Sequence, residues 1–98
     1  MGRDEIIARL RENEAALRAR GVVHAALFGS RAREDAGPES DTDIMIELDP
    51  GARLGVWGYV GVKELVAGLF EGKVDVIDRD GLKPYVRPAV IAEAVYAF

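Results

Sequence analysis

Two short apolar segments constrain the fold of this chain more than any other feature. Residues 22–28, VVHAALF, are almost all apolar and start with β-branched residues, which is typical of a strand buried on both faces. Residues 41–48, DTDIMIEL, alternate with period two and predict a second strand. One face of that strand carries Thr42, Ile44, Ile46 and Leu48, and the other carries Asp41, Asp43, Met45 and Glu47. Two aspartates therefore project the same way at the edge of the expected core.

Helical patterns surround these strands. From Asp4, a suitable N-cap, apolar residues recur at helical spacing until Gly21, a natural C-terminal glycine. A second helix is predicted from about Val56 to Phe70, and a last short helix has Pro88 at its first position and ends at about Ala94.

A further alternating segment, KVDVIDR at 73–79, predicts another strand, with Asp75 and Ile77 on the face opposite Val74 and Val76. The order of elements predicts an α+β fold, in which a small mixed sheet of three to four strands has helices packed on one face. A chain of 98 residues has room for one core, so we expect a single domain over residues 1–98.

Composition restricts the chemistry to carboxylates. The chain has no cysteine and one histidine, His24, so thiolate sites and the usual zinc and Ser-His-Asp arrangements are excluded. A net charge of −4 argues against a protein that coats nucleic acid. No apolar stretch approaches membrane-spanning length, which predicts a soluble, cytoplasmic protein without membrane contact.

Asp41 and Asp43 have the spacing of shared metal ligands. Carboxylates at i and i+2 of a strand stand roughly 6–7 Å apart along it, so their oxygens can converge on one cation. Magnesium takes hard oxygen ligands and leaves positions open for substrate phosphates. Two such ions can hold the attacking and leaving oxygens of a phosphoryl transfer.

Gly29 and Ser30 lie where the first strand meets a short helix that Ser30 can cap, through about Arg33. Free N–H groups and the positive helix end attract phosphate at such a junction, and a glycine lets phosphate approach closely. A Gly-Ser dipeptide alone is a weak signal. Here ten residues separate Ser30 from the Asp41-x-Asp43 pair, and Asp75 follows on another strand.

This pattern, embedded as LFGSRAREDAGPESDTDIMI, resembles the signature of the minimal nucleotidyltransferases, a compact branch of the DNA polymerase beta-like superfamily. The resemblance extends to the N-terminal helix, to KVDVI with its third aspartate, and to the tail KPYVRPAVIAEAVYAF, so it covers nearly the whole chain.

The resemblance implies a role for each matching residue. Gly29 and Ser30 would hold the β- and γ-phosphates of ATP, and Arg31 could neutralise phosphate charge. Asp41 and Asp43 would ligate two Mg²⁺ ions. Asp75 would bind one of these ions and help to deprotonate the acceptor hydroxyl.

The resemblance also implies a partner. Members of this branch are commonly encoded beside a helical HEPN-domain ribonuclease toxin and act as its antitoxin, in characterised cases by transferring AMP from ATP to a toxin tyrosine. Two alternatives stay open: a binding antitoxin that covers the toxin without catalysis, and nucleotidyl transfer to a small molecule. Self-association also stays open.

Each residue has an ordinary structural interpretation as well. Asp41 and Asp43 could be solvent-facing acids at a strand start, Asp75 an outward residue of an edge strand, and Ser30 a helix cap. Arg31 and Arg33 could be solvated helix residues, and His24 could be a structural histidine. The apolar group at the start of the second predicted helix could belong to the core or form a partner-binding patch; it consists of Val56, Trp57, Tyr59 and Val60.

Overall fold

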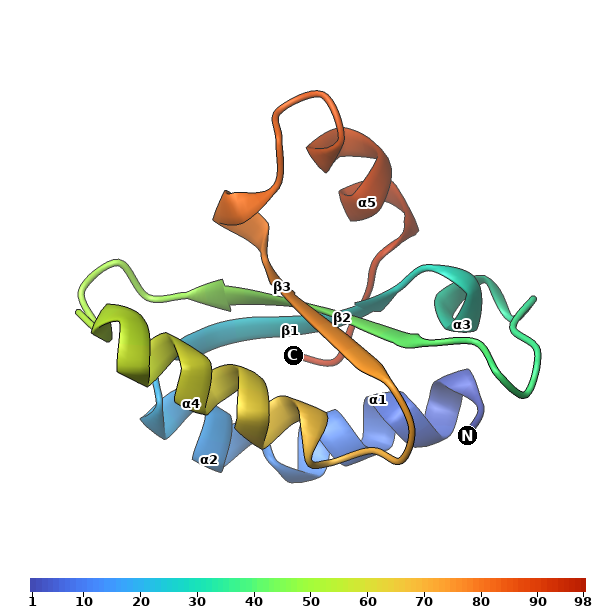
Figure 1. The fold of residues 1–98 in the computed structure, drawn as a ribbon, viewed down its shortest axis with the longest axis horizontal. Helices are drawn as coiled ribbons and strands as arrows, with labels where there is room; N and C mark the ends of the chain where they lie inside the picture. Colours follow the sequence, from blue (N-terminus) through green and yellow to red (C-terminus); the bar gives the residue numbers. More distant parts are fainter.

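The computed structural model describes all residues, 1–98, and contains a four-stranded sheet with helices (Figure 1). The elements are α1 (Arg3–Glu12), α2 (Glu14–Ala19), β1 (Val22–Phe28), α3 (Ser30–Arg33), β2 (Thr42–Leu48), α4 (Gly55–Ala67), β3 (Val74–Asp78), the 3₁₀ turn η1 (Arg79–Gly81), α5 (Arg87–Glu93) and β4 (Val95–Tyr96). The sheet order is β3-β2-β1-β4, which confirms the predicted α+β fold with a small mixed sheet. None of the helices combines the length and the hydrophobicity that a membrane span requires.

The sheet is antiparallel except at one edge. β1 pairs with both β2 and β4 in antiparallel fashion, whereas β2 and β3 run parallel. Parallel neighbours need a long crossover, and α4 provides it between β2 and β3. The carboxyl-terminal turn of β1 and the first residues of β2 and β3 therefore meet at one end of the sheet.

The core lies on one face of the sheet, under α1, α2 and α4 (Figure 1). Ile44 and Ile46 of β2 point into it and have no exposed surface, as the period-two pattern predicts. Val76 of β3 joins the same cluster. α5 lies over the opposite face of the sheet, where the alternating pattern places Asp43, Asp75 and Ile77, so the prediction that the helices pack on one face holds for α1, α2 and α4 but not for α5.

The N-terminal helix differs from the continuous helix predicted between Asp4 and Gly21. It starts at Arg3, with Gly2 as its N-cap, and breaks at Asn13 into α1 and α2. The Asn13 side chain donates to the Arg9 carbonyl at 2.8 Å, which is the local competition with helix geometry that asparagine offers.

Two further differences concern short elements. Gly29, and not Ser30, occupies the N-cap of α3, and no side chain caps that helix. The tail adds β4, which has only two residues and pairs with Ala26 and Leu27 of β1. A two-residue strand leaves no periodic pattern, so only pairing with β1 reveals it.

Replacing Ile44 by alanine should lower the free energy of unfolding by about 2–5 kcal/mol, because the change leaves a cavity in a core without room to relax. Val56→Ala is the control, since Val56 is 75% exposed and the change should stay within about 0.5 kcal/mol. Urea unfolding followed by circular dichroism measures both. Equal losses would contradict the placement of the core.

Candidate functional site

Asp43 and Asp75 lie side by side on neighbouring parallel strands. They are register partners in the β2–β3 ladder, so their side chains project from the same face of the sheet. Asp43 is half-buried, and Asp75 is exposed. Both line one cavity of about 760 Å³, which falls in the size range of small-molecule sites. The structure therefore brings together these two of the three predicted acidic residues.

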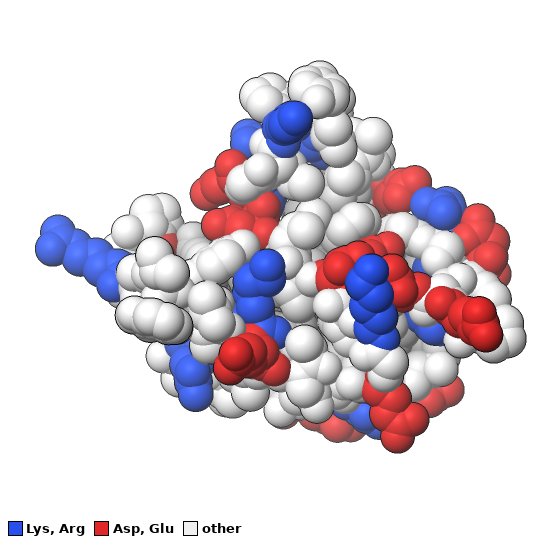
Figure 2. Space-filling view, viewed as in Figure 1, with Lys and Arg blue, Asp and Glu red and all other residues white.

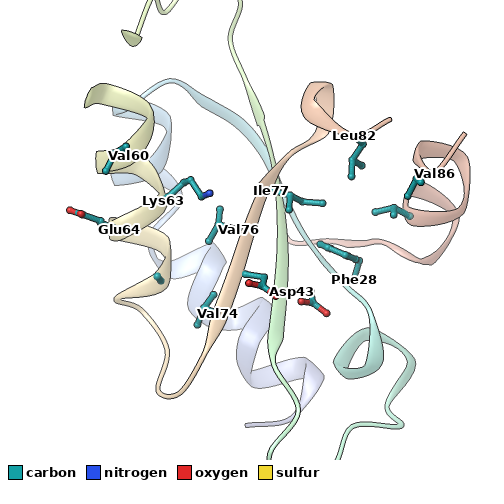
Figure 3. Close-up of a pocket in the computed structure, with 13 residues that line it drawn as sticks. Phe28, Asp43, Val60, Lys63, Glu64, Val74, Val76, Ile77, Leu82 and Val86 are labelled. Atoms are coloured by element: carbon teal, nitrogen blue, oxygen red, sulfur yellow. The ribbon is translucent and has the colours of Figure 1, made fainter. Parts of the chain in front are cut away.

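The cavity extends on both sides of β3 (Figure 3). Toward α5, the two aspartates are accompanied by apolar lining from Phe28, Ile77, Leu82, Val86 and Val90. Toward α4, the lining consists of Val60, Lys63, Glu64, Ala67, Val74 and Val76. In the space-filling view, a white surface without Lys, Arg, Asp or Glu runs from α5 down past β3, with charged groups on either side (Figure 2).

Gly29 packs directly against the Asp43 carboxylate. It follows β1, whose last residue, Phe28, is the register partner of Asp43. Its φ of +75° and ψ of −157° belong to a region that is essentially reserved for glycine. A Cβ at this position would overlap Asp43 Oδ2. Glycine is therefore required twice, once by the backbone and once by the carboxylate.

Asp41 sits apart from the cavity that Asp43 and Asp75 share. It lies just before β2 and lines a second hollow of about 310 Å³ together with Ser40 and Lys73. Lys73 Nζ is 3.5 Å from Asp41 Oδ2, so the ammonium neutralises this carboxylate in the free protein. With Lys73 71% exposed, the ion pair is a weak one that a stronger cation can replace.

Asp43 is the electrostatic centre of the site. Burial raises the pKa of its carboxyl group, and the neighbouring charges of Asp75 and Asp41 raise it further. Lys73 and Arg33 act in the opposite direction on this pKa, although their effects are smaller. The protein thus holds three carboxylates near one another at an electrostatic cost that a bound cation would offset.

The donor set fits a divalent cation of the magnesium type. Asp43 and Asp75 provide hard carboxylate oxygens on adjacent strands, and Asp41 stands two residues before Asp43. No three acidic or histidine side chains are already clustered closely enough to hold one ion. Asp41 would have to leave Lys73 to join the other two.

Ser30 and Arg31 start α3 immediately after Gly29. The guanidinium of Arg31 donates to the backbone carbonyls of Ser40, at 2.7 Å, and Met1, at 3.0 Å. Arg31 therefore braces the loop before β2, and it lines the two smaller hollows rather than the cavity of Asp43 and Asp75. A phosphate-binding role for Arg31 stays a prediction, and so do the roles of Gly29 and Ser30.

Sequence reasoning missed two lysines. Lys63 of α4 lines the large cavity as its one basic residue, and Lys73 pairs with Asp41. The alternating pattern of residues 73–79 carried a signal for Lys73, because it shares its face with Asp75. Nothing in the sequence of α4 separates Lys63 from a solvent-exposed helix residue.

Paired carboxylates on adjacent strands, next to a glycine turn that opens a helix, are the arrangement of an enzyme that transfers phosphoryl or nucleotidyl groups. Residues 4–97 match the nucleotidyltransferase domain family, and the chain belongs to this family. The resemblance to minimal nucleotidyltransferases is thereby confirmed, as is the assignment to the nucleotidyltransferases.

Relatives with assigned activities cover most of the chain. The protein adenylyltransferase MntA of Thermococcus cleftensis is 30% identical over 94 residues, which is 95% of this chain and 93% of the relative. A presumed protein adenylyltransferase of Methanocaldococcus jannaschii is 34% identical over 76 residues, which is 76% of each chain.

Solved structures agree with the fold. A presumed minimal nucleotidyltransferase superposes with a TM-score of 0.78 at 29% identity and covers 97% of this chain and 95% of its own. A toxin–antitoxin crystal structure with AMP-PNP shares the fold, with a TM-score of 0.68 at 19% identity, over 100% of this chain and 73% of the other.

Gly29→Ala should destabilise the protein by about 1–3 kcal/mol and displace the Asp43 carboxylate. Gly72→Ala is the matched control, because Gly72 has a φ of +77° but open space around a new Cβ. Thermal unfolding with and without Mg²⁺ separates the backbone strain, which both variants share, from the displacement of the Asp43 carboxylate, which only the Gly29 variant should cause. The cation should stabilise the Gly72 variant and leave the Gly29 variant unchanged, whereas equal responses would contradict the contact.

The raised pKa of Asp43 predicts a pH-dependent stability. Between the ordinary pKa of an aspartate and the raised pKa of Asp43, the folded state holds a proton that the unfolded state has lost, so the fold loses stability as pH rises from about 4 through the raised pKa. Asp43→Asn removes the titrating carboxyl group and with it this contribution to the pH dependence of stability. Without divalent cations, the stability difference between the variant and the wild type should therefore grow in favour of the variant from acid to neutral pH. Urea titrations at several pH values measure it, and a constant difference would refute the prediction.

Proposed function

We propose that this protein transfers AMP from ATP to a hydroxyl group of a partner protein, a tyrosine of a HEPN-domain toxin, and thereby acts as its antitoxin. The observation that carries the proposal is the pairing of Asp43 with Asp75 at one cavity, beside the Gly29 turn. Relatives that are about 30% identical over most of the chain are protein adenylyltransferases, which supports AMP as the transferred group.

The proposed reaction assigns separate tasks to the residues. The backbone at Gly29 and Ser30, where β1 meets α3, would receive the β- and γ-phosphates, because Gly29 has no side chain of its own to keep a phosphate away. Asp41, Asp43 and Asp75 would hold Mg²⁺. When bound, these cations would supply the positive charge that ATP and the departing pyrophosphate require.

The transfer itself exchanges one bond for another. The acceptor oxygen forms a bond to the α-phosphorus, and the bond from that phosphorus to the oxygen bridging the α- and β-phosphates breaks. Pyrophosphate leaves with the electron pair of the broken bond. The acceptor hydroxyl gives its proton to a carboxylate, and the exposed Asp75 is the residue that we assign to this step.

The test is incubation with ATP labelled at the α-phosphate, Mg²⁺ and the toxin of the proposal, a helical protein that we expect the neighbouring gene to encode. Label should appear on the neighbour, and mass spectrometry should locate AMP on a tyrosine. ATP labelled at the γ-phosphate serves as the control, because its label leaves with pyrophosphate. Absence of labelling together with absence of ATP binding by calorimetry would refute the enzymatic proposal.

A non-catalytic antitoxin that covers the toxin is the alternative, and one observation favours it. Val56 and Trp57, at the start of α4, are 75% and 86% exposed, which is unusual for apolar side chains and suits a protein contact.

The double variant Asp41→Asn with Asp43→Asn separates the two functions, because it removes metal ligation while keeping side-chain volume. Catalysis predicts that AMP transfer falls at least about 100-fold and that toxin neutralisation is lost, while binding to the toxin persists. Trp57→Ala tests the non-catalytic alternative, since an antitoxin that blocks the toxin by contact depends on the area of that contact. Neutralisation that survives the double variant and fails in the Trp57 variant would favour the alternative.

A further inference from the structure

β3 forms an open edge of the sheet next to the site. It is the terminal strand in the order β3-β2-β1-β4. The Thr42 amide donates to the Lys73 carbonyl at 3.1 Å, and Thr42 and Ile44 are the register partners of Val74 and Val76. In a parallel ladder with this register, the N–H and C=O groups of Val74 and Val76 point away from β2. No backbone hydrogen bond outside the regular elements reaches either residue.

Side chains line the cavity above and below this open edge. On the α4 side, Val60 and Ala67 of the helix face Val74 and Val76. On the α5 side, Leu82 and Val86 lie near Ile77 (Figure 3). A strand added beside β3 would therefore find an apolar wall on the α5 side and, on the α4 side, the apolar Val60 and Ala67 together with the charged Lys63 and Glu64, because successive side chains of a strand point in opposite directions.

A nucleotide alone does not account for this cavity. ATP bound at Asp43 and Asp75 would occupy the face of β3 toward α5, on which both carboxylates lie. The α4 lining, apolar at Val60 and Ala67 and charged at Lys63 and Glu64, lies on the other face, beyond the edge of the strand. Only a ligand that passes along the edge contacts both walls at once.

We propose that an extended segment of the acceptor protein binds as an additional strand on the open edge of β3, with alternate apolar side chains packed against α4 and α5. The inference rests on the proposed function, because it identifies how the acceptor is held. Asp75 lies on the same strand, so a hydroxyl-bearing residue of the added segment would be presented beside the acidic pair. Backbone hydrogen bonds would supply affinity and the two walls would supply specificity.

Charge argues against a second copy of this chain as the occupant. β3 carries Asp75 and Asp78 within five residues, and Glu64 lies beside it on α4. Pairing two β3 edges would bring these carboxylates together, and like charges on paired strands are destabilising. The segment that fits is apolar at alternate positions and has no acidic residue facing Asp75.

The test uses a phage-displayed library of random twelve-residue peptides, selected on the wild-type protein and counter-selected on Val74→Pro. Proline at this first strand position removes an outward N–H without breaking the ladder to β2. Val74→Ala is the matched control, because it shortens the side chain but keeps the N–H. Selected peptides should show apolar residues two positions apart. They should bind the alanine variant within about threefold of wild type and the proline variant at least tenfold more weakly by calorimetry.

Amide hydrogen exchange on the wild-type protein provides a second measurement that needs no variant. A selected peptide should slow exchange at Val74 and Val76 at least tenfold, and the same peptide with N-methylated alternate amides should not. The proposal is overturned if no peptide is enriched, if selected peptides leave these two amides unchanged, if ATP with Mg²⁺ alone protects them, or if protection grows with protein concentration without peptide.

The outcomes keep the two proposals apart. Peptide protection at Val74 and Val76 without any AMP transfer to the neighbour would retain the binding edge and refute the transfer. AMP transfer without peptide protection would retain the enzyme and refute the binding edge.

Discussion

The parallel pairing of β2 with β3 is the constraint on which the site depends. It sets Asp43 opposite Asp75, and the crossover through α4 makes this pairing possible. A slip of β2 by one residue would turn Asp43 into the core and both Ile44 and Ile46 out of it. The buried Ile44 and Ile46 prevent such a slip, so the hydrophobic core fixes the register of the acidic pair.

That register has an electrostatic cost. Asp43 is partly desolvated between Gly29 and the sheet, and its raised pKa records both the burial and the repulsion from two other carboxylates. Lys73 compensates part of the charge from an exposed position, where it can be displaced. A cation that binds here would relieve the repulsion between the carboxylates, and this relief would contribute to the free energy of cation binding. Local instability of this kind is a usual property of functional sites.

Much of the fold followed from local patterns. The bounds of β1 and the two faces of β2 were predictable because burial on one or both faces leaves a periodic signal. The break at Asn13 was not predictable, since it depends on a single side-chain hydrogen bond. The two-residue β4 was not predictable either, since it depends on pairing with β1. At the site, the pattern found Asp43 and Asp75 but not the contact of Arg31 with the Ser40 carbonyl.

The amino-acid sequence alone limits which groups can do chemistry here. It contains no thiol and one histidine, and its alternating segments fix the face on which each aspartate lies. The fold was needed to show that Asp75 stands beside Asp43, that Asp41 pairs with Lys73, and that β3 is an open edge between the cavity linings of α4 and α5. This is because strand order and pairing arise from contacts between residues far apart in the chain. The periodicity within one segment does not indicate which other strands pair with it.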